Sequence, residues 1–227
     1  MKHYFPSEYG TDPALSTRSF PAAGFEFKIQ HKAEAEALGL KVWCIYTGMF
    51  LEGGMSARNG QCKGHTTQSR LASANAPNGV AGIDTTTNVW ELAPPGNTPF
   101  AFTSTRDLGP ILLRSLLSIQ EPALLPTDGG LRVYSSCETW SSYAETWQQV
   151  TGNPVKKKWL TDAELDEGMA NGPGGGFAAF VKVAGQEGAF DHSQENVMEA
   201  LERVEVGGQW ERVTMEVLAR ESLAVSK

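Results

Sequence analysis

The sequence predicts an α/β protein: a partial Rossmann-like parallel sheet with a smaller α/β substrate-binding region. Three segments near the start lead to this prediction. A β-prone run at residues 3–5, a helix-favouring segment at 26–38 and an apolar run at 40–50 follow one another as strand, helix and strand. This order is that of a βαβ unit with a right-handed crossover. Alternating strand and helix signals continue from residue 83, as expected of an α/β fold.

Each element of the predicted βαβ unit is delimited by local signals. The first strand ends in FPSEYG, residues 5–10, whose Pro, Ser and Gly favour a turn. The segment 26–38 is rich in Ala, Glu and Lys, which favour a helix, and Gly39 supplies its end. The run LKVWCIYTGMF, residues 40–50, is typical of a strand buried on both faces. We therefore expect Cys44 to be a small core residue.

Residues 53–80 interrupt this pattern. Their large apolar side chains are only Met55, Leu71 and Val80, and they show neither helical nor strand periodicity. Ordering a backbone costs ~1–2 kcal/mol per residue, so we expect a disordered surface insert; translated non-coding sequence is the alternative. The predicted organisation is the C-terminal part of a Rossmann-like domain at 1–52, the insert at 53–80, and the smaller α/β region at 81–227.

The substrate-binding region contains its own sequence of elements. Strands are predicted at 89–92, 100–105, 131–135 and 156–159, and helices at 110–119 and 139–150. Thr161 and Glu164 resemble a capping box, so another helix should follow. We interpret the glycine-rich segment 172–176 as a hinge or lid loop, and the remainder favours helix. Lysines 156–158 fit a solvated strand edge better than a phosphate site.

Composition excludes several classes of partner. The 227 residues include 26 acidic and 19 basic side chains, for a net charge of −7. Binding to a nucleic-acid backbone or an anionic membrane needs positive charge, so neither is expected. No apolar run approaches the length of a bilayer span, and the acidic start does not resemble a secretory leader. The three cysteines are few and far apart, as in a cytoplasmic protein without a disulfide framework.

Standard catalytic signatures are missing from the sequence. It contains no G-x-x-x-x-G-K-[ST], H-E-x-x-H, C-x-x-C or G-x-S-x-G pattern, so no metal site is predicted. His192 stands beside Asp191, but neighbours in sequence rarely form a catalytic pair. We expect His192 to be a surface histidine.

The informative polar residues lie at predicted strand ends. Ser7 and Glu8 follow the first strand, Thr47 and Gly48 lie near the end of the second, and Lys28 is close to the start of the helix between them. Ligands of open α/β sheets bind beyond the carboxyl ends of the strands. These residues therefore predict a small-molecule crevice, while a lysine that only caps a solvated turn remains an open alternative.

These motifs resemble the NmrA-like and isoflavone-reductase-like family, atypical relatives of the short-chain dehydrogenases. That family has a Pro-Ser-Glu-(Phe/Tyr)-Gly strand end, a lysine that opens the next helix, and a following strand that ends in Phe. The matching stretches here are FPSEYG, KIQHKAEAEALGL and VWCIYTGMFLE. FTSTRDLGPILLRSLL resembles its Asp-(Ile/Leu)-Gly helix start, and LRVYSS, ETWSSYAETWQQVTG and KKKWLTDAEL resemble its later elements. The resemblance covers residues 1–50 and about 83–170. It implies that 1–52 form the C-terminal part of a Rossmann-like NAD(P)-binding domain and that 81–227 form a substrate-binding region.

The resemblance implies an oxidoreductase-type protein that uses NADP or NAD and acts on a small organic metabolite. It implies a cofactor site with Pro6, Ser7, Glu8 and Lys32, and a substrate pocket with Tyr9, Gly48, Met49 and Phe50. Lys28 would act in proton transfer or in holding the substrate. An ordinary lysine pKa is about 10.4, so Lys28 needs desolvation or a cationic neighbour such as Lys32 to act as a base. Otherwise it donates, protonated, to a developing oxyanion.

Two departures from the family change what is expected of the cofactor. The family's N-terminal βαβ units, with the glycine-rich loop that holds the pyrophosphate, have no counterpart here. We therefore expect a truncated product that binds the cofactor weakly. Lys32 stands where arginine is common and lacks its bidentate fork. Two alternatives stay open: an NmrA-type regulator that senses the dinucleotide without turnover, and an inactive fragment.

Overall fold

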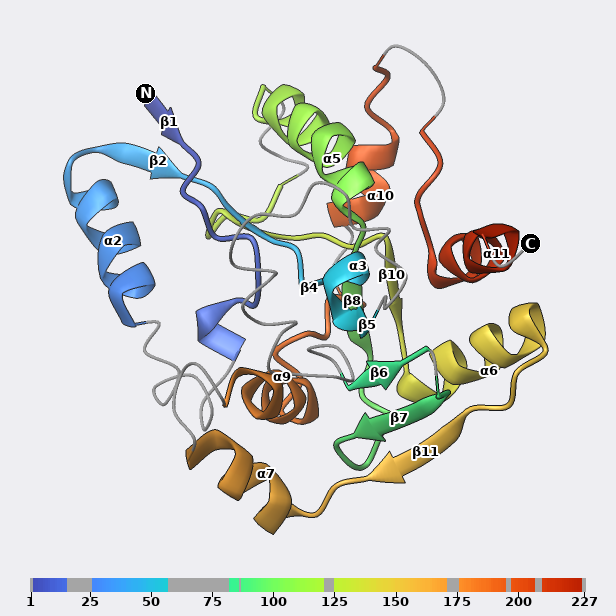
Figure 1. Ribbon diagram of the computed structural model, residues 1–227. Coiled ribbons are helices and arrows are strands. Elements are labelled where there is room, and N and C mark those ends of the chain that lie inside the picture. The colour runs from blue at the N-terminus through green and yellow to red at the C-terminus, as the bar shows by residue number, and fades with distance from the viewer. Residues whose placement is uncertain are drawn as a thin grey trace.

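The computed structural model describes residues 2–15, 26–56, 82–85, 87–120, 125–170, 176–194, 197–206 and 210–225. Within them, helices surround four small sheets (Figure 1). The strands are β1 (Lys2–Tyr4), β2 (Leu40–Val42), β3 (Cys44–Tyr46), β4 (Met49–Phe50), β5 (Met55–Ser56), β6 (Ile83–Asp84), β7 (Val89–Leu92), β8 (Phe100–Thr103), β9 (Gly130–Arg132), β10 (Ser136–Glu138) and β11 (Lys156–Trp159). The helices are η1 (Pro13–Leu15), α2 (Glu26–Ala37), α3 (Leu51–Gly54), α5 (Thr105–Ser118), α6 (Trp140–Thr151), α7 (Asp162–Ala170), α9 (Phe177–Gln186), α10 (Val197–Glu202) and α11 (Met215–Val225). The predicted α/β class is confirmed.

The predicted βαβ unit is present as β1, α2 and β2. β1 pairs in parallel with β2, with Lys2 opposite Leu40 and Tyr4 opposite Val42. α2 ends just before Gly39, which has a φ of +77°, a left-handed conformation that glycine adopts without steric cost. The helix and its terminating glycine therefore lie where the sequence predicted them.

The apolar run 40–50 is divided into three strands, so the prediction of one continuous strand was wrong. β2 pairs with β1, β3 pairs in parallel with β9, and β4 pairs in parallel with β8. The break before β4 has a steric cause. Gly48 has a φ of +65°, and a Cβ at this position would lie 2.3 Å from the Ala101 carbonyl oxygen, so the backbone turns where only glycine fits.

The other two sheets are mixed. One has the order β10-β8-β4, with β10 antiparallel to β8, and the other has the order β11-β7-β6-β5. Both join the start of the chain to its later part, because β4 and β5 lie before residue 57 and their partners β8 and β6 after residue 82. The division into domains at residue 52 remains a prediction; β4 and β8 pair across it.

Two apolar clusters form most of the core. One surrounds Phe100, Phe102, Trp140, Tyr143 and Phe190, which are all buried. The aromatic rings of this first cluster stack or meet edge to face, and the Phe100 and Phe190 centroids are 4.3 Å apart. The second cluster includes Trp43, Ile45, Ile111 and Leu131, and it packs α5 against β3 and β9. Cys44 is buried, as predicted.

Several local predictions are confirmed. Thr161 and Glu164 form the reciprocal hydrogen bonds of a capping box at the start of α7. Thr139 caps α6, which ends at Gly152 in the left-handed conformation. β11 begins and ends as predicted, and its lysines are exposed.

Two predicted loops fall largely outside the described residues. Residues 57–80 of the expected insert and 172–175 of the expected hinge are not among them. At the start of the insert, residues 53 and 54 complete α3, and β5 pairs in parallel with β6. Regular structure therefore extends to Ser56, because the backbone there finds partners that its side-chain pattern did not indicate. In the described part of the chain, no helix is long and apolar enough to cross a bilayer.

Candidate active site

Lys28 lies against the turn that follows β1. Its Nζ is 2.9 Å from Glu8 Oε2 and donates to the Ser7 carbonyl oxygen at 3.3 Å. The Glu8 side chain is 6% exposed and that of Lys28 is 21% exposed, so the ion pair is mostly shielded from water. The structure thus brings three of the predicted site residues together at the carboxyl end of a parallel strand.

The turn itself is held by its own backbone. The Glu8 N–H donates to the Pro6 carbonyl at 2.9 Å, and Pro6 is buried while Ser7 is exposed. Tyr9 is partly buried and packs against the cluster that contains Trp43. The rigid Pro6 turn therefore presents Ser7 outward and turns Glu8 inward to Lys28.

Gly48 ties the end of the next strand to the same turn. Its N–H donates to the Gly10 carbonyl at 3.1 Å. The neighbouring Thr47 carbonyl accepts a 2.7 Å hydrogen bond from Thr103 Oγ1, and both threonines are fully buried. The turn that follows β1 and the end of β3 are thus joined directly through their backbones.

Met49 and Phe50 lie in β4 and are partly buried. Glu52, which follows them, accepts hydrogen bonds from Ser104 Oγ at 2.5 Å and from the Thr105 N–H at 3.0 Å. Glu52 therefore caps α5, where a carboxylate also interacts well with the helix dipole. The sequence analysis did not single out Glu52, because nothing local reveals a partner about fifty residues away.

Lys32 contacts a different part of the molecule from Lys28. Its Nζ donates to the Asp128 carbonyl at 3.1 Å and lies 3.9 Å from Glu36. These contacts hold α2 to the loop before β9. The roles predicted for Lys32, in cofactor binding and as a cationic neighbour of Lys28, remain predictions.

A buried polar group lies beside these strand ends and was missed by the sequence analysis. Arg132, at the end of β9, forms an ion pair with Asp12, and its guanidinium carbon is 6.0 Å from the centre of the Tyr46 ring. Burial, followed by the charge of Asp12, raises the pKa of Tyr46. Tyr46 is therefore neutral and cannot act as a phenolate base at ordinary pH.

His192 belongs to this buried group, so its expected surface position was wrong. It is 0% exposed, and its Nδ1 lies 3.0 Å from the Val133 carbonyl. A carbonyl only accepts, so Nδ1 carries the hydrogen and Nε2 is an acceptor, for which the described residues provide no partner. Burial, with the charge of Arg132 adding to it, lowers the pKa of His192 to about 4. Its neighbours in sequence gave no sign of this, because its hydrogen-bond partner Val133 lies 59 residues away in the chain.

Asp107, in the Asp-Leu-Gly stretch, holds two segments of the chain together. It is buried and accepts hydrogen bonds from Ser135 Oγ, from Trp210 Nε1 at 2.9 Å and from the Val213 N–H at 2.8 Å. These three donors saturate the carboxylate. Asp107 therefore anchors the segment before α11 to α5 and is not available for chemistry.

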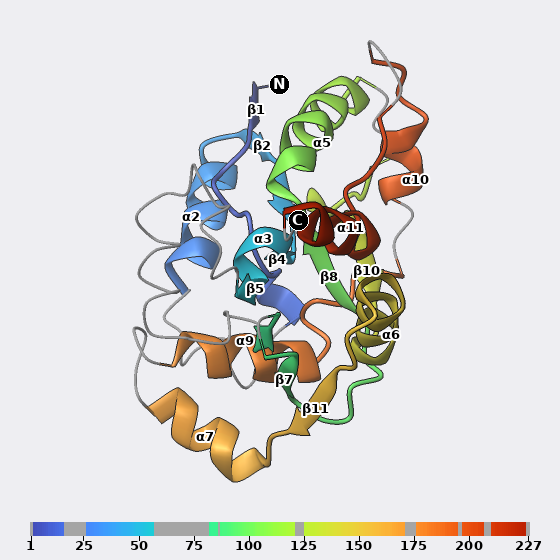
Figure 2. The ribbon, with the colours of Figure 1, turned by 45° about the vertical axis from the view of Figure 1, so that its right-hand side comes forward.

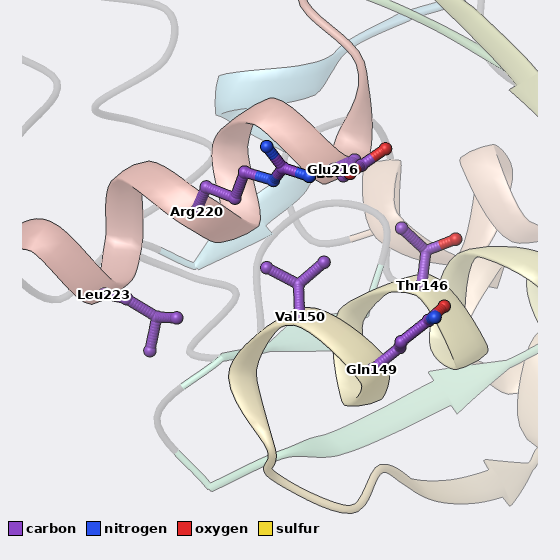
Figure 3. Close-up of a pocket in the computed structure, with 6 residues that line it drawn as sticks. All are labelled: Thr146, Gln149, Val150, Glu216, Arg220 and Leu223. Atoms are coloured by element: carbon purple, nitrogen blue, oxygen red, sulfur yellow. Dashed lines mark hydrogen bonds and ion pairs between the residues drawn. The ribbon is translucent and has the colours of Figure 1, made fainter.

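A hollow of about 610 Å³ lies elsewhere, between α6 and α11 (Figure 3). It is lined by Thr146, Gln149, Val150, Glu216, Arg220 and Leu223, and its charged residues Arg220 and Glu216 pair with each other. α2, with Lys28, lies on the opposite side of the molecule in Figure 1. Because Glu216 and Arg220 in its lining are largely exposed and pair with each other, we place the candidate active site at the strand ends instead.

Comparisons with known proteins agree with this architecture. No protein-family model matches the sequence, and no curated protein matches it. Three solved structures are similar in fold. Leucoanthocyanidin reductase from Vitis vinifera, in a binary complex with NADPH, matches with a TM-score of 0.58 and 15% identity over 85% of this chain and 56% of its own. Isoflavone reductase matches with a TM-score of 0.59 and 15% identity over 97% of this chain and 66% of its own. AtPrR2, with NADP+ and (+)-pinoresinol, matches with a TM-score of 0.58 and 14% identity over 97% of this chain and 64% of its own.

The chain has the fold of these reductases. The resemblance inferred from FPSEYG and the motifs that follow it is thus confirmed at the level of the fold. The chain spans between 56% and 66% of the length of these three structures. At 14–15% identity, the match says nothing about activity, so the roles of individual residues rest on the geometry described above.

Proposed function

We propose that this chain carries the substrate side of an NADPH-dependent oxidoreductase that acts on a small organic metabolite. The observation that carries the proposal is the position of Lys28, whose Nζ is 2.9 Å from Glu8 and 3.3 Å from the Ser7 carbonyl at the end of β1. Carboxyl ends of parallel strands are where open α/β sheets bind their ligands. Two relatives of this fold have structures with NADPH or NADP+.

The residues at this site fit only one end of the cofactor. Pro6 and Ser7 form a rigid strand end with Ser7 exposed, suited to border a nicotinamide ring. No glycine-rich G-x-x-G-x-x-G stretch exists in the sequence to receive a pyrophosphate. The proposal therefore assigns the nicotinamide end to Pro6 and Ser7 and leaves the phosphates without an assigned partner in this chain.

Lys28 would act as a protonated donor. Both atoms that it contacts, a carboxylate oxygen and a carbonyl oxygen, are acceptors, which fits an ammonium group. NADPH, when bound, supplies a hydride to the substrate. Lys28 then stabilises the oxyanion that develops and delivers a proton to it, while Glu8 holds the amine in position. Met49 and Phe50 would line the substrate pocket as its apolar wall.

Nicotinamide mononucleotide tests this assignment because it needs no pyrophosphate loop. Titrated into the full chain and followed by backbone NMR, it should shift the signals of Ser7, Glu8 and Gly48. In the Lys28→Ala variant, the affinity for nicotinamide mononucleotide measured from these shifts should fall about tenfold. In Lys156→Ala, on the exposed face of β11, it should stay the same. Shifts confined to the α6–α11 groove, or equal effects of both variants, would contradict the assignment.

A dinucleotide sensor without turnover is the second candidate. The observation that favours it is the same ion pair, because a lysine paired with a mostly buried carboxylate also fits a residue that only positions the ligand and transfers no proton. A sensor would bind nicotinamide mononucleotide and still lose most of that binding in Lys28→Ala. It would show no oxidation of NADPH with any ketone or enone offered.

A further inference from the structure

The inward face of α5 is largely polar. Four of its five buried residues are Asp107, Arg114, Ser115 and Ser118, and the fifth is Ile111. Buried polar groups normally find hydrogen-bond partners within the protein. Asp107 has three donors, and Ser118 Oγ donates to the Arg114 carbonyl at 2.9 Å. The other charged group on this face is the Arg114 guanidinium, which has a different environment.

Arg114 is nearly enclosed and has no acid beside it. It is 6% exposed, and its guanidinium carbon lies over the Trp210 ring, 4.8 Å from the ring centre. Among the described residues, no carboxylate lies within ion-pairing distance of the guanidinium, and no oxygen accepts a hydrogen bond from it. A guanidinium cannot release its proton in a protein, and an unpaired buried charge is costly. The position therefore favours the binding of an anion.

The acidic residues of α10 and of the inward face of α5 are already paired. α10 lies beside α5 in both views (Figures 1 and 2), and the two helices share an apolar cluster. On α10, Glu199 pairs with Arg203 at 3.7 Å. Glu202 pairs with Arg212 at 2.9 Å, and Asp107 has its three donors. A shift of one of these carboxylates to Arg114 would leave its present partner unpaired, so the site favours an added anion.

One edge of the Arg114 guanidinium remains available to a ligand. Trp210, over which it lies, is held in place by the 2.9 Å hydrogen bond from its Nε1 to Asp107. Of the three guanidinium nitrogens, only Nε is both fully shielded from water and without a partner in the described part of the chain. The Nη1–Nη2 edge therefore faces the narrow opening that remains. Its N–H groups form a planar fork that matches the two oxygens of one carboxylate.

We propose that Arg114 and Trp210 form a binding site for a small organic carboxylate. A carboxylate neutralises the single charge of the guanidinium, whereas a phosphate group carries about −1.5 to −2 at pH 7. The protein already has a net charge of −7, which disfavours the larger negative charge. The Trp210 ring offers an apolar surface to the hydrocarbon part of the ligand. The site involves neither Lys28 nor the strand ends, so it is separate from the proposed function.

Titration of the full chain with sodium propionate tests the proposal. The indole N–H signal of Trp210 is followed by NMR at pH 7.5, with sodium chloride adjusted to keep the ionic strength constant. We expect this signal to shift saturably with propionate. Arg114→Lys keeps the charge and loses the fork, so the affinity should fall about tenfold or more. The matched control Arg203→Lys changes an arginine whose side chain is 74% exposed, and its affinity should equal that of the wild type.

Chloride and inorganic phosphate serve as comparison anions. An equal response to propionate and chloride, or equal weakening by the two lysine variants, overturns the site. Tighter binding of phosphate than of propionate overturns the carboxylate assignment.

The stability of Arg114→Met provides a second test, because this variant removes a buried charge that has no acid beside it. Its melting temperature in chloride should be at least that of the wild type, and propionate should raise the melting temperature of the wild type only. A large fall in Arg114→Met would overturn the proposal, since Arg114 would then be satisfied within the fold. Lys28→Ala should bind propionate as the wild type does, so the failure of either proposal leaves the other intact.

Discussion

Protonation of His192 should destabilise the fold as the pH falls below about 6.5. The side chain is 0% exposed, and burial lowers its pKa from 6.5 to about 4. A histidine with a lower pKa in the folded state binds fewer protons there than in the unfolded chain. Its contribution to stability is therefore complete above pH 6.5 and decreases as the pH falls toward 4.

The two pKa values determine the size of the effect. With values of 6.5 unfolded and about 4 folded, the free energy of unfolding falls by about 2 kcal/mol between pH 8 and pH 5, and by about 3 kcal/mol at pH 4. The charge of Arg132 opposes protonation, whereas the carboxylates of Asp12 and Asp191 favour it. Carboxylates elsewhere also titrate below pH 5, so the wild type alone does not isolate the histidine.

Urea denaturation followed by circular dichroism at pH 5.0, 6.0 and 7.5 measures this effect. His192→Asn keeps an N–H near the Val133 carbonyl and removes the titrating ring. It should be less stable than wild type at pH 7.5, and the gap should narrow by about 2 kcal/mol at pH 5. A gap that stays constant across this range would show that His192 keeps an ordinary pKa, and the buried position would then be wrong.

Three further predictions concern Gly48, Glu52 and the cofactor. Gly48→Ala should lower the free energy of unfolding, measured in urea, by about 3 kcal/mol or more, because its φ is +65° and the new Cβ would lie 2.3 Å from the Ala101 carbonyl oxygen. Gly152→Ala is the control: its φ is +73° but the space around it is open, so it should cost about 1 kcal/mol. Equal costs for the two variants would refute the steric argument. Glu52→Ala should cost about 1 kcal/mol, because the Thr105 N–H at the start of α5 loses its acceptor while the Ser104 cap remains. Glu52→Gln should partly restore this stability, and an unchanged urea midpoint in Glu52→Ala would show that the contact is not needed. Calorimetric titration of the chain with NADPH should show no micromolar binding, because the sequence lacks a glycine-rich phosphate loop, and a micromolar dissociation constant would contradict this.

Elements with strong local signals could be predicted from the sequence. α2 ends before Gly39 as expected, α7 begins at a capping box, and β11 has the predicted bounds. Each depends on backbone conformation or on contacts within four residues, which residue types near the element determine. The contact of Lys28 with the turn after β1 could also be predicted, because a βαβ unit places the start of its helix beside the end of its first strand.

The features decided by tertiary structure involve residues far apart in the chain. An apolar run of eleven residues contains nothing that says where it changes partners, so the division of 40–50 among β2, β3 and β4 depends on strands β1, β9 and β8. The burial of His192 depends on Val133, and the capping role of Glu52 on Thr105. Leu113, Leu116 and Leu117 of α5 are exposed, and the sequence pattern predicted only that they lie in a helix. Hydrophobic period determines which residues share a face, but only the packed structure decides whether that face is covered, because burial depends on which other elements meet it.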